Sequence, residues 1–418
     1  MAVGGFFGLA KGLIYAKALG SEEMGVYSFG ALLALYGISL ATFGVYRGLD
    51  CVLPVLFGGR EIEKAYALRN LSAGYLLLVT GLMTGCTFLI SLLPVFTNPA
   101  IAPLLRAAVV LAVTTAHFGL ALIELRSNGR TLELSAVIAI KGALLCAIGL
   151  LATGRISATG LIAAESAINS VLFVVSAAWL SRRYSFSFRP PGAILELMRV
   201  GVPVSIKDLI QDFTLYLDRW SIVYLFGFDA LGKYAFALAL VAVGEVIRTA
   251  IGMRIGATAA QEFGRSGSIR AMLARINQSS RVALALFLLG WIPFSFLSGH
   301  MVRRYFPDYS EVVTILPILY LGVALQTINI YEWIPMALKR TRLLLASTLI
   351  ALAGVAAIYG VGVLRGWPIS GFAWGFVASR ALMLTAHFVI SVVLTNRYEG
   401  ERRKSSLESI DDSTHLIR

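Results

Sequence analysis

Long apolar blocks separated by short polar segments recur along almost the whole chain. Each block holds about 20 residues, enough for one α-helix to cross the hydrocarbon core of a bilayer. A β-barrel would show shorter segments of alternating polarity, and that pattern does not dominate here. The pattern predicts an all-α polytopic membrane protein with about twelve transmembrane helices, at residues 2–19, 25–45, 71–95, 101–124, 133–153, 157–181, 200–226, 230–253, 282–302, 312–336, 341–364 and 368–395.

The composition agrees with a membrane protein. The chain has 418 residues, of which 58% are hydrophobic and only 14% are charged, whereas soluble domains carry about 25% charged residues. The net charge is +13, but the basic residues lie between the spans rather than in a basic domain, so we expect no nucleic-acid partner. Three cysteines, Cys51, Cys86 and Cys146, show neither metal nor disulfide spacing, and we expect no metal site.

Basic residues between the spans predict the orientation. The loops after the even-numbered spans and the C-terminal segment are rich in Arg and Lys, whereas the loops after the odd-numbered spans hold few. The positive-inside rule then places both termini in the cytoplasm, for a chain in the inner cell membrane. Lys11 and Lys17 lie within and near the end of the first apolar stretch. A signal peptide carries its positive charges before that stretch, so we interpret residues 2–19 as a short span or one that begins upstream.

A weak internal repeat relates the two halves of the chain. A shift of 207 residues brings Gly20 onto Gly227, Gly25 onto Gly232 and Tyr27 onto Tyr234, among eight identities in 28 positions. Each half holds six predicted spans, an even number, so both halves enter the membrane from the same side. This predicts two six-helix lobes, 1–190 and 191–396, related by a pseudo-twofold axis along the membrane normal with a cleft between them. Residues 397–418 are expected to form a disordered cytoplasmic tail.

The predicted span 200–226 carries charges where lipid is expected. Its polar residues fall within an arc of about 140° on a helical wheel. Facing lipid, five charges would cost about 15 kcal/mol, whereas the apolar residues of the span would recover only about 5 kcal/mol. Three interpretations stay open: an internal salt-bridge network, the lining of a water-filled substrate cavity, or a helix lying flat at the interface. The polar residues are Lys207, Asp208, Gln211, Asp212, Asp218 and Arg219.

The segment 18–29, which reads ALGSEEMGVYSF, resembles the LGxEExGxY turn of Wzx-type polysaccharide flippases of the multidrug/oligosaccharidyl-lipid/polysaccharide exporter superfamily. The resemblance implies a V-shaped transporter, not an enzyme. It would flip an undecaprenyl-pyrophosphate-linked oligosaccharide from the inner to the outer leaflet for lipopolysaccharide or exopolysaccharide synthesis. Implied partners are the lipid-linked oligosaccharide, membrane lipids, a polysaccharide polymerase and glycosyltransferases. No cofactor is implied, only coupling to H⁺ or Na⁺.

Charged residues inside the other spans complete the candidate cavity. A pyrophosphate needs cationic partners, which Lys11, Lys141, Arg248 and Arg380 would supply, while sugar hydroxyls suit Asp and Gln side chains. The family has no invariant substrate motif, so these assignments rest on chemistry. The predicted substrate-binding set is Lys11, Lys141, Asp208, Gln211, Asp212, Asp218, Arg219, Arg248 and Arg380.

Two alternatives to the flippase stay open. An ion-coupled multidrug or cation antiporter of the same superfamily would use Asp208, Asp212 and Asp218 as its embedded carboxylates. A membrane enzyme such as a glycosyltransferase is the weaker alternative, because no loop is long enough for a catalytic domain and no Gly-rich phosphate cradle follows a strand. The net charge of the cavity separates the first two: a cationic cavity favours the lipid-linked glycan and an anionic one favours the drug.

Overall fold

Helices account for nearly all of the structure, as the apolar blocks predicted. This computed structural model describes residues 2–93, 101–154, 156–180, 184–188, 191–242, 244, 268–338 and 340–415, and no β-strand occurs in these ranges. Nine helices of the described ranges are long and apolar enough to cross a membrane, or ten if the bent pair Pro307–Thr314 and Leu316–Pro335 counts as one span. The chain is therefore an all-helical, multi-pass membrane protein.

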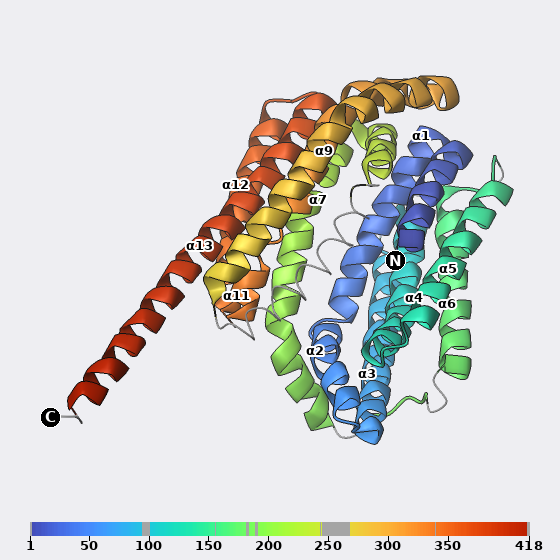
Figure 1. Cartoon of the computed structure of the whole chain (residues 1–418). Coiled ribbons are helices and arrows are strands. Elements are labelled where there is room, and N and C mark those ends of the chain that lie inside the picture. The colour runs from blue at the N-terminus through green and yellow to red at the C-terminus, as the bar shows by residue number, and fades with distance from the viewer. Residues whose placement is uncertain are drawn as a thin grey trace. The chain divides into compact units, whose positions relative to one another are not determined.

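Two helices each contain a pair of predicted spans. Helix α1 (Ala2–Ala41) holds the predicted span 2–19 and residues 25–41 of the predicted span 25–45. Helix α7 (Pro191–Val241) holds the span 200–226 and residues 230–241 of the span 230–253 (Figure 1). Each is broken by one glycine in the left-handed region, Gly20 at φ 75° and Gly227 at φ 79°. These glycines are the first pair of the predicted repeat, and a side chain there would be strained.

The two repeated segments also contact each other reciprocally. The Cα of Gly25 lies against the carbonyl of Phe228, and the Cα of Gly232 lies against the carbonyl of Ser21, with no room for a side chain at either glycine. Ser21 and Phe228 are themselves 207 positions apart, so each contact is the repeat image of the other, as a local twofold requires. Small residues that let two helix backbones approach closely are a common device in membranes.

Substitutions at this crossing should therefore be costly. We expect Gly25→Ala and Gly232→Ala each to lower the free energy of unfolding by about 1–3 kcal/mol, because the added methyl group overlaps a backbone carbonyl. Thermal unfolding of the purified protein checks this. Gly8→Ala is the matched control, since nothing lies within 4 Å of its added Cβ; a loss there as large as at Gly25 would contradict the explanation.

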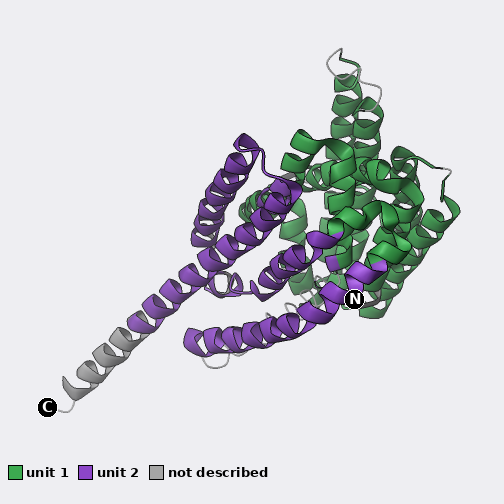
Figure 2. Ribbon diagram, turned by 90° about the horizontal axis from the view of Figure 1, so that it is seen from above, with its two compact units in different colours: residues 1–212, 219–240, 302–312 green, residues 213–218, 241–301, 313–418 purple. Residues whose placement is uncertain are grey.

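The described chain divides into two compact units (Figure 2). Unit 1 contains residues 1–212, 219–240 and 302–312. Helix α4 is central to this unit, because it packs against α1, α3 and α6. Besides α1 and most of α7, unit 1 contains α2 (Val45–Gly58), α3 (Ile62–Ile90), α4 (Ile101–Ser127), α5 (Thr131–Leu151), α6 (Ala158–Val175) and the π-helical turn η2 (Ser176–Leu180).

Unit 2 contains residues 213–218, 241–301 and 313–418. In it α13 packs against α10 and α12. Helix α13 extends through residues 397–415, which the sequence analysis assigned to a disordered tail. The predicted lobe boundary at residue 190 stays a prediction. The helices of this part are α9 (Ile269–Tyr305), the 3-10 helix η3 (Pro307–Thr314), whose first residues belong to unit 1, α10 (Leu316–Ile328), α11 (Trp333–Ala337), α12 (Thr341–Leu364) and α13 (Ile369–His415).

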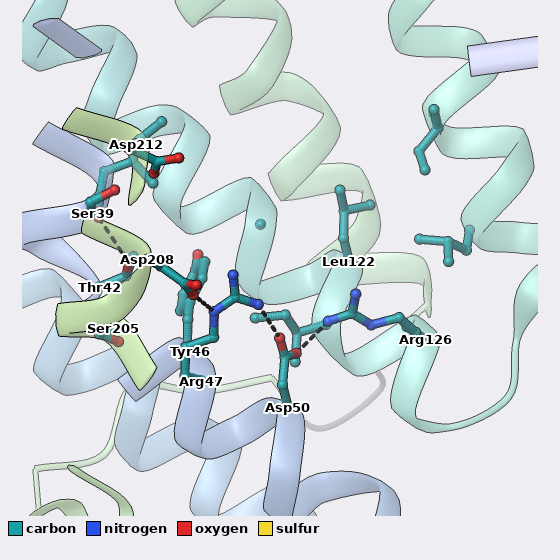
Figure 3. Close-up of a pocket in the computed structure, with 15 residues that line it drawn as sticks. Ser39, Thr42, Tyr46, Arg47, Asp50, Leu122, Arg126, Ser205, Asp208 and Asp212 are labelled. Carbon is teal, nitrogen blue, oxygen red and sulfur yellow. Dashed lines mark hydrogen bonds and ion pairs between the residues drawn. The ribbon is translucent and has the colours of Figure 1, made fainter. Parts of the chain in front are cut away.

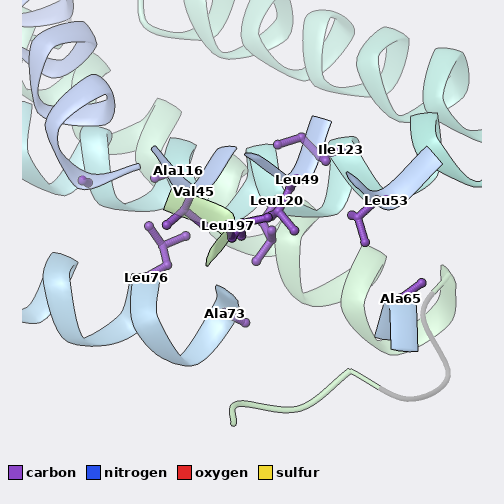
Figure 4. Close-up of a cluster of buried hydrophobic side chains, with 11 residues drawn as sticks. Val45, Leu49, Leu53, Ala65, Ala73, Leu76, Ala116, Leu120, Ile123 and Leu197 are labelled. Carbon is purple, nitrogen blue, oxygen red and sulfur yellow. The ribbon is translucent and has the colours of Figure 1, made fainter. Parts of the chain in front are cut away.

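A buried apolar cluster in unit 1 holds α2, α3, α4 and the start of α7 together (Figure 4). Helix α2 contributes Val45, Leu49 and Leu53, which recur every four residues and so share one face of the helix. Its opposite face carries polar residues. From α4 the cluster takes Ala116, Leu120 and Ile123 in the same way. Helix α2 is thereby fixed with its polar face turned away from this cluster.

Candidate functional site

The polar face of α2 lines a pocket in unit 1 with a volume of about 400 Å³ (Figure 3). Its walls come from the end of α1, from α2, from the C-terminal half of α4, from the start of α5 and from α7. Five charged side chains and four hydroxyl-bearing side chains line it. They are Arg47, Asp50, Arg126, Asp208 and Asp212, with Ser39, Thr42, Tyr46 and Ser205.

Ion pairs connect three helices around this pocket. Arg47 on α2 donates from Nε to Asp208 Oδ2 of α7 at 2.5 Å, and its Nη1 lies 3.5 Å from Asp50 Oδ2. Asp50 also pairs with Arg126 at the end of α4. Lys207 Nζ lies 3.4 Å from Asp208 Oδ1. Burial alone would lower the pKa of Arg47, but Asp208 and Asp50 raise it above its ordinary value, so the guanidinium stays charged.

Asp212 differs from its neighbour Asp208. It lines the same pocket one helical turn further along α7, yet it makes no ion pair with any residue in the described ranges. Asp208 thus combines ion pairs with a place in the pocket lining, whereas Asp212 lines the pocket without an ion pair in the described ranges. Both residues lie at the pocket, as expected if the arc faces water; that they bind a substrate stays a prediction.

Lys11 belongs to a separate buried cluster. Its Nζ lies 3.2 Å and 3.3 Å from the two carboxylate oxygens of Glu165 on α6. The hydroxyl of Tyr27 donates to Glu165 at 2.7 Å, and the ammonium also lies near the rings of Tyr15 and Tyr27. Glu165 therefore compensates the charge of Lys11, and this lysine does not line the pocket.

Lys141 and Gln211 also lie away from the pocket lining. Lys141 on α5 has its Nζ 5.1 Å from the centre of the Phe118 ring and makes no ion pair with any residue that the structure describes. The side-chain carbonyl of Gln211 on α7 is buried without a hydrogen-bond partner among the described residues. Neither residue is among those that line the charged pocket.

The remaining predicted site residues are spread over α7 and unit 2. Asp218 is 1% exposed, and Arg219, the next residue along α7, is half-buried. Arg380 on α13 is 5% exposed; its Nη2 donates to the Leu215 carbonyl at 3.1 Å, and its guanidinium lies 4.3 Å from the centre of the Phe376 ring. Arg248 lies outside the described residues.

The segment 18–29 contributes structural contacts in unit 1. Gly20 makes the bend in α1 and Gly25 makes the close crossing described above. Glu23 accepts a hydrogen bond of 2.5 Å from the backbone N–H of Ala158, the first residue of α6. An acidic side chain is favourable at that end of a helix. Tyr27 completes the Glu165 cluster.

Three charged residues of the pocket are not among the predicted site residues: Arg47, Asp50 and Arg126. The one local signal was the placement of Asp50 three residues after Arg47, which puts the two on neighbouring positions of a helix face. The pairing of Arg47 with Asp208 has no local signature, because these two residues lie 161 positions apart.

Comparison with known proteins identifies the fold. No family model and no curated protein matches the sequence. Three solved structures each align with 96% of the chain. An inward-facing multidrug resistance MATE family transporter of the MOP superfamily has 14% identity and a TM-score of 0.75 over 96% of its own chain. Its outward-facing counterpart has 15% identity and a TM-score of 0.60 over 93%.

A MATE protein in complex with MaD3S has 16% identity and a TM-score of 0.63, with 94% of its own chain covered. In each case the similarity extends over nearly the full length of both aligned chains. The chain therefore has the two-lobe, all-helical fold seen in transporters of the MATE family.

Proposed function

We propose that this chain is an alternating-access transporter that flips a lipid-linked oligosaccharide, carried on undecaprenyl pyrophosphate, from the inner to the outer leaflet. The fold supports transport, because solved structures with this fold include inward-facing and outward-facing transporters. The proposed location is the inner membrane with both termini in the cytoplasm. Glycosyltransferases and a polysaccharide polymerase are the proposed partners, which would supply and consume the glycan.

The lining of the pocket is the observation that carries this proposal. It combines two arginines, three aspartates and four hydroxyl groups. Sugars and phosphates offer many hydrogen-bond donors and acceptors. The charged and hydroxyl side chains of this lining can form hydrogen bonds with them. A pocket for an apolar drug is lined predominantly by hydrophobic and aromatic side chains, and Tyr46 is the one aromatic residue here.

An ion-coupled multidrug or cation antiporter is the second candidate. Asp212 favours it, because a carboxylate without an ion-pair partner in the described ranges lies at the pocket. The charged residues of the lining also number three acidic against two basic. In the flippase, the same carboxylate would instead bind sugar hydroxyls or the coupling H⁺ or Na⁺.

Two transport assays on the protein in lipid vesicles separate the candidates. One follows the flipping of a fluorescent saccharide linked by a diphosphate to a prenyl chain, and the other follows the uptake of ethidium, a cationic drug. We expect flipping and no ethidium uptake. Ethidium uptake without flipping would replace the flippase by the antiporter.

Asp212→Asn tests the role of the pocket in either activity. We expect it to lower the flipping rate at least tenfold, which is about 1.4 kcal/mol of transition-state stabilisation, while the amount of folded protein stays that of the wild type. Glu133→Gln is the matched control, because Glu133 pairs with Arg130 at the start of α5 and does not line the pocket. Equal rates for both variants and the wild type would show that the pocket is not on the transport path.

A further inference from the structure

Arg47 and Arg126 are held around a single carboxylate at the pocket. Asp50 pairs with both, so that two guanidinium groups from different helices face the same small region (Figure 3). Their side chains are 48% and 50% exposed, whereas that of Asp50 is 20% exposed. The cations are therefore accessible from the pocket, and the anion between them is the more enclosed group.

The aspartates leave most of the donor capacity of these arginines unused. Each guanidinium carries five N–H donors in a planar fork. In the described ranges, Arg47 donates to Asp208 and Arg126 donates to Asp50, with Asp50 as a second, longer contact of Arg47. Phosphoryl oxygens match the fork geometry of arginine bidentately. Two such forks offer places for two phosphoryl groups.

From this geometry we infer that Arg47 and Arg126 form a diphosphate-binding site in which Asp50 is the internal competitor. The inference rests on the proposed function and moves the diphosphate contact from Lys11, Lys141, Arg248 and Arg380 to two other residues. Lys11 is compensated by Glu165 and Arg380 is buried, so neither offers the exposed fork that Arg47 and Arg126 do.

Asp50 has a physical role in such a site. With no ligand bound, it compensates two cations that would otherwise repel each other, and it holds both guanidiniums in place. When a diphosphate binds, Asp50 has to give up its contacts, and this exchange weakens the binding. A transporter needs binding that is favourable enough for entry and weak enough for release. Asp208 has a second cation, Lys207, at 3.4 Å, so it keeps a partner when Arg47 turns to the ligand.

Binding of farnesyl diphosphate to the full chain in nanodiscs of neutral lipid, measured by calorimetry, tests the site. We expect the wild type to bind it and Arg126→Gln to weaken binding about tenfold or more, the effect of losing a charge-assisted fork. Arg126→Lys should fall between them, because it keeps the charge and loses the fork. Asp50→Asn should tighten binding, because the competitor loses its charge.

Arg130→Gln is the matched control. It removes the same charge four residues further along the chain, from a side chain that pairs with Glu133 and does not line the pocket. We expect wild-type affinity there. Thermal unfolding of each variant separates a lost site from lost folding, and if Arg126→Gln fails to fold, Arg126→Lys carries the comparison.

The outcomes distinguish this inference from the proposed function. If the wild type binds farnesyl diphosphate and Arg126→Gln or Arg126→Lys binds it equally well, the site is wrong and the flippase proposal stands. If Asp50→Asn weakens binding, its role as competitor is wrong. If inorganic pyrophosphate binds as tightly as farnesyl diphosphate, the site recognises the free anion and not a lipid-linked one. If the wild type binds neither farnesyl diphosphate nor inorganic pyrophosphate but does bind tetraphenylphosphonium, both the site and the flippase are overturned.

Discussion

Replacement of Arg69 by alanine should leave little folded protein. Arg69 on α3 is 1% exposed, and its Nη1 donates to Glu124 on α4 at 2.7 Å. Its Nε and Nη2 donate to the side-chain oxygen of Asn70 at 3.0 Å and 2.7 Å, and its guanidinium lies between the rings of Tyr66 and Tyr184. Removing one partner of a buried ion pair costs about 3–5 kcal/mol, because the other charge stays buried without compensation.

Size-exclusion profiles and thermal unfolding of the solubilised protein measure this loss. Lys64→Ala on the same helix is the matched control, because Lys64 pairs with Glu61 at an exposed position, where an ion pair contributes about 0–1 kcal/mol. The double substitution of Arg69 and Glu124, each by leucine, should recover part of the stability, since no unpaired charge then remains. A folded, stable Arg69→Ala protein would show that Glu124 is not a buried charge in the native state.

The second large loss of stability is expected for Glu165→Ala, a substitution in the interior of unit 1. Glu165 is 7% exposed and accepts hydrogen bonds from both Lys11 and Tyr27. The substitution leaves the ammonium of Lys11, whose side chain is only 25% exposed, beside the rings of Tyr15 and Tyr27 without its carboxylate partner. We expect a loss of about 3–5 kcal/mol in the free energy of unfolding, seen as a lower unfolding temperature and a smaller folded fraction.

The double substitution of Lys11 by methionine and Glu165 by leucine tests the explanation. It removes both charges at similar volume, and we expect it to be more stable than Glu165→Ala alone. Lys141→Met is the control, because Lys141 makes no ion pair in the described ranges, and removing its charge should leave stability unchanged or raise it. If Glu165→Ala proved as stable as Lys141→Met, the Lys11–Glu165 pair would not be a stabilising contact.

The places of the two breaks could be predicted from the sequence, and the pocket could not. Gly20 and Gly227 lie between the predicted spans, at positions that the repeat aligned, and the structure shows a positive φ at both. Where an apolar block is interrupted is a property of the local sequence. The polar arc of α7 was also predicted from local periodicity, and the structure brings Asp208 and Asp212 to the pocket. Which cation pairs with which carboxylate could not be predicted, because partners such as Arg47 and Asp208 lie 161 positions apart in the sequence.

The sequence by itself determined the class of this protein. The length and continuous apolar character of the blocks indicate a helical chain that crosses the membrane repeatedly. Backbone groups in lipid must be hydrogen-bonded within the protein, and blocks of about 20 residues suit a helix, whereas the strands of a barrel are shorter and alternate in polarity. Only the tertiary structure decided which buried charges pair. It assigned Lys11 to Glu165 and Arg47 to Asp50 and Asp208. Hydropathy is a property of each segment, whereas an ion pair depends on the distance between segments, and that distance is set by how the helices pack.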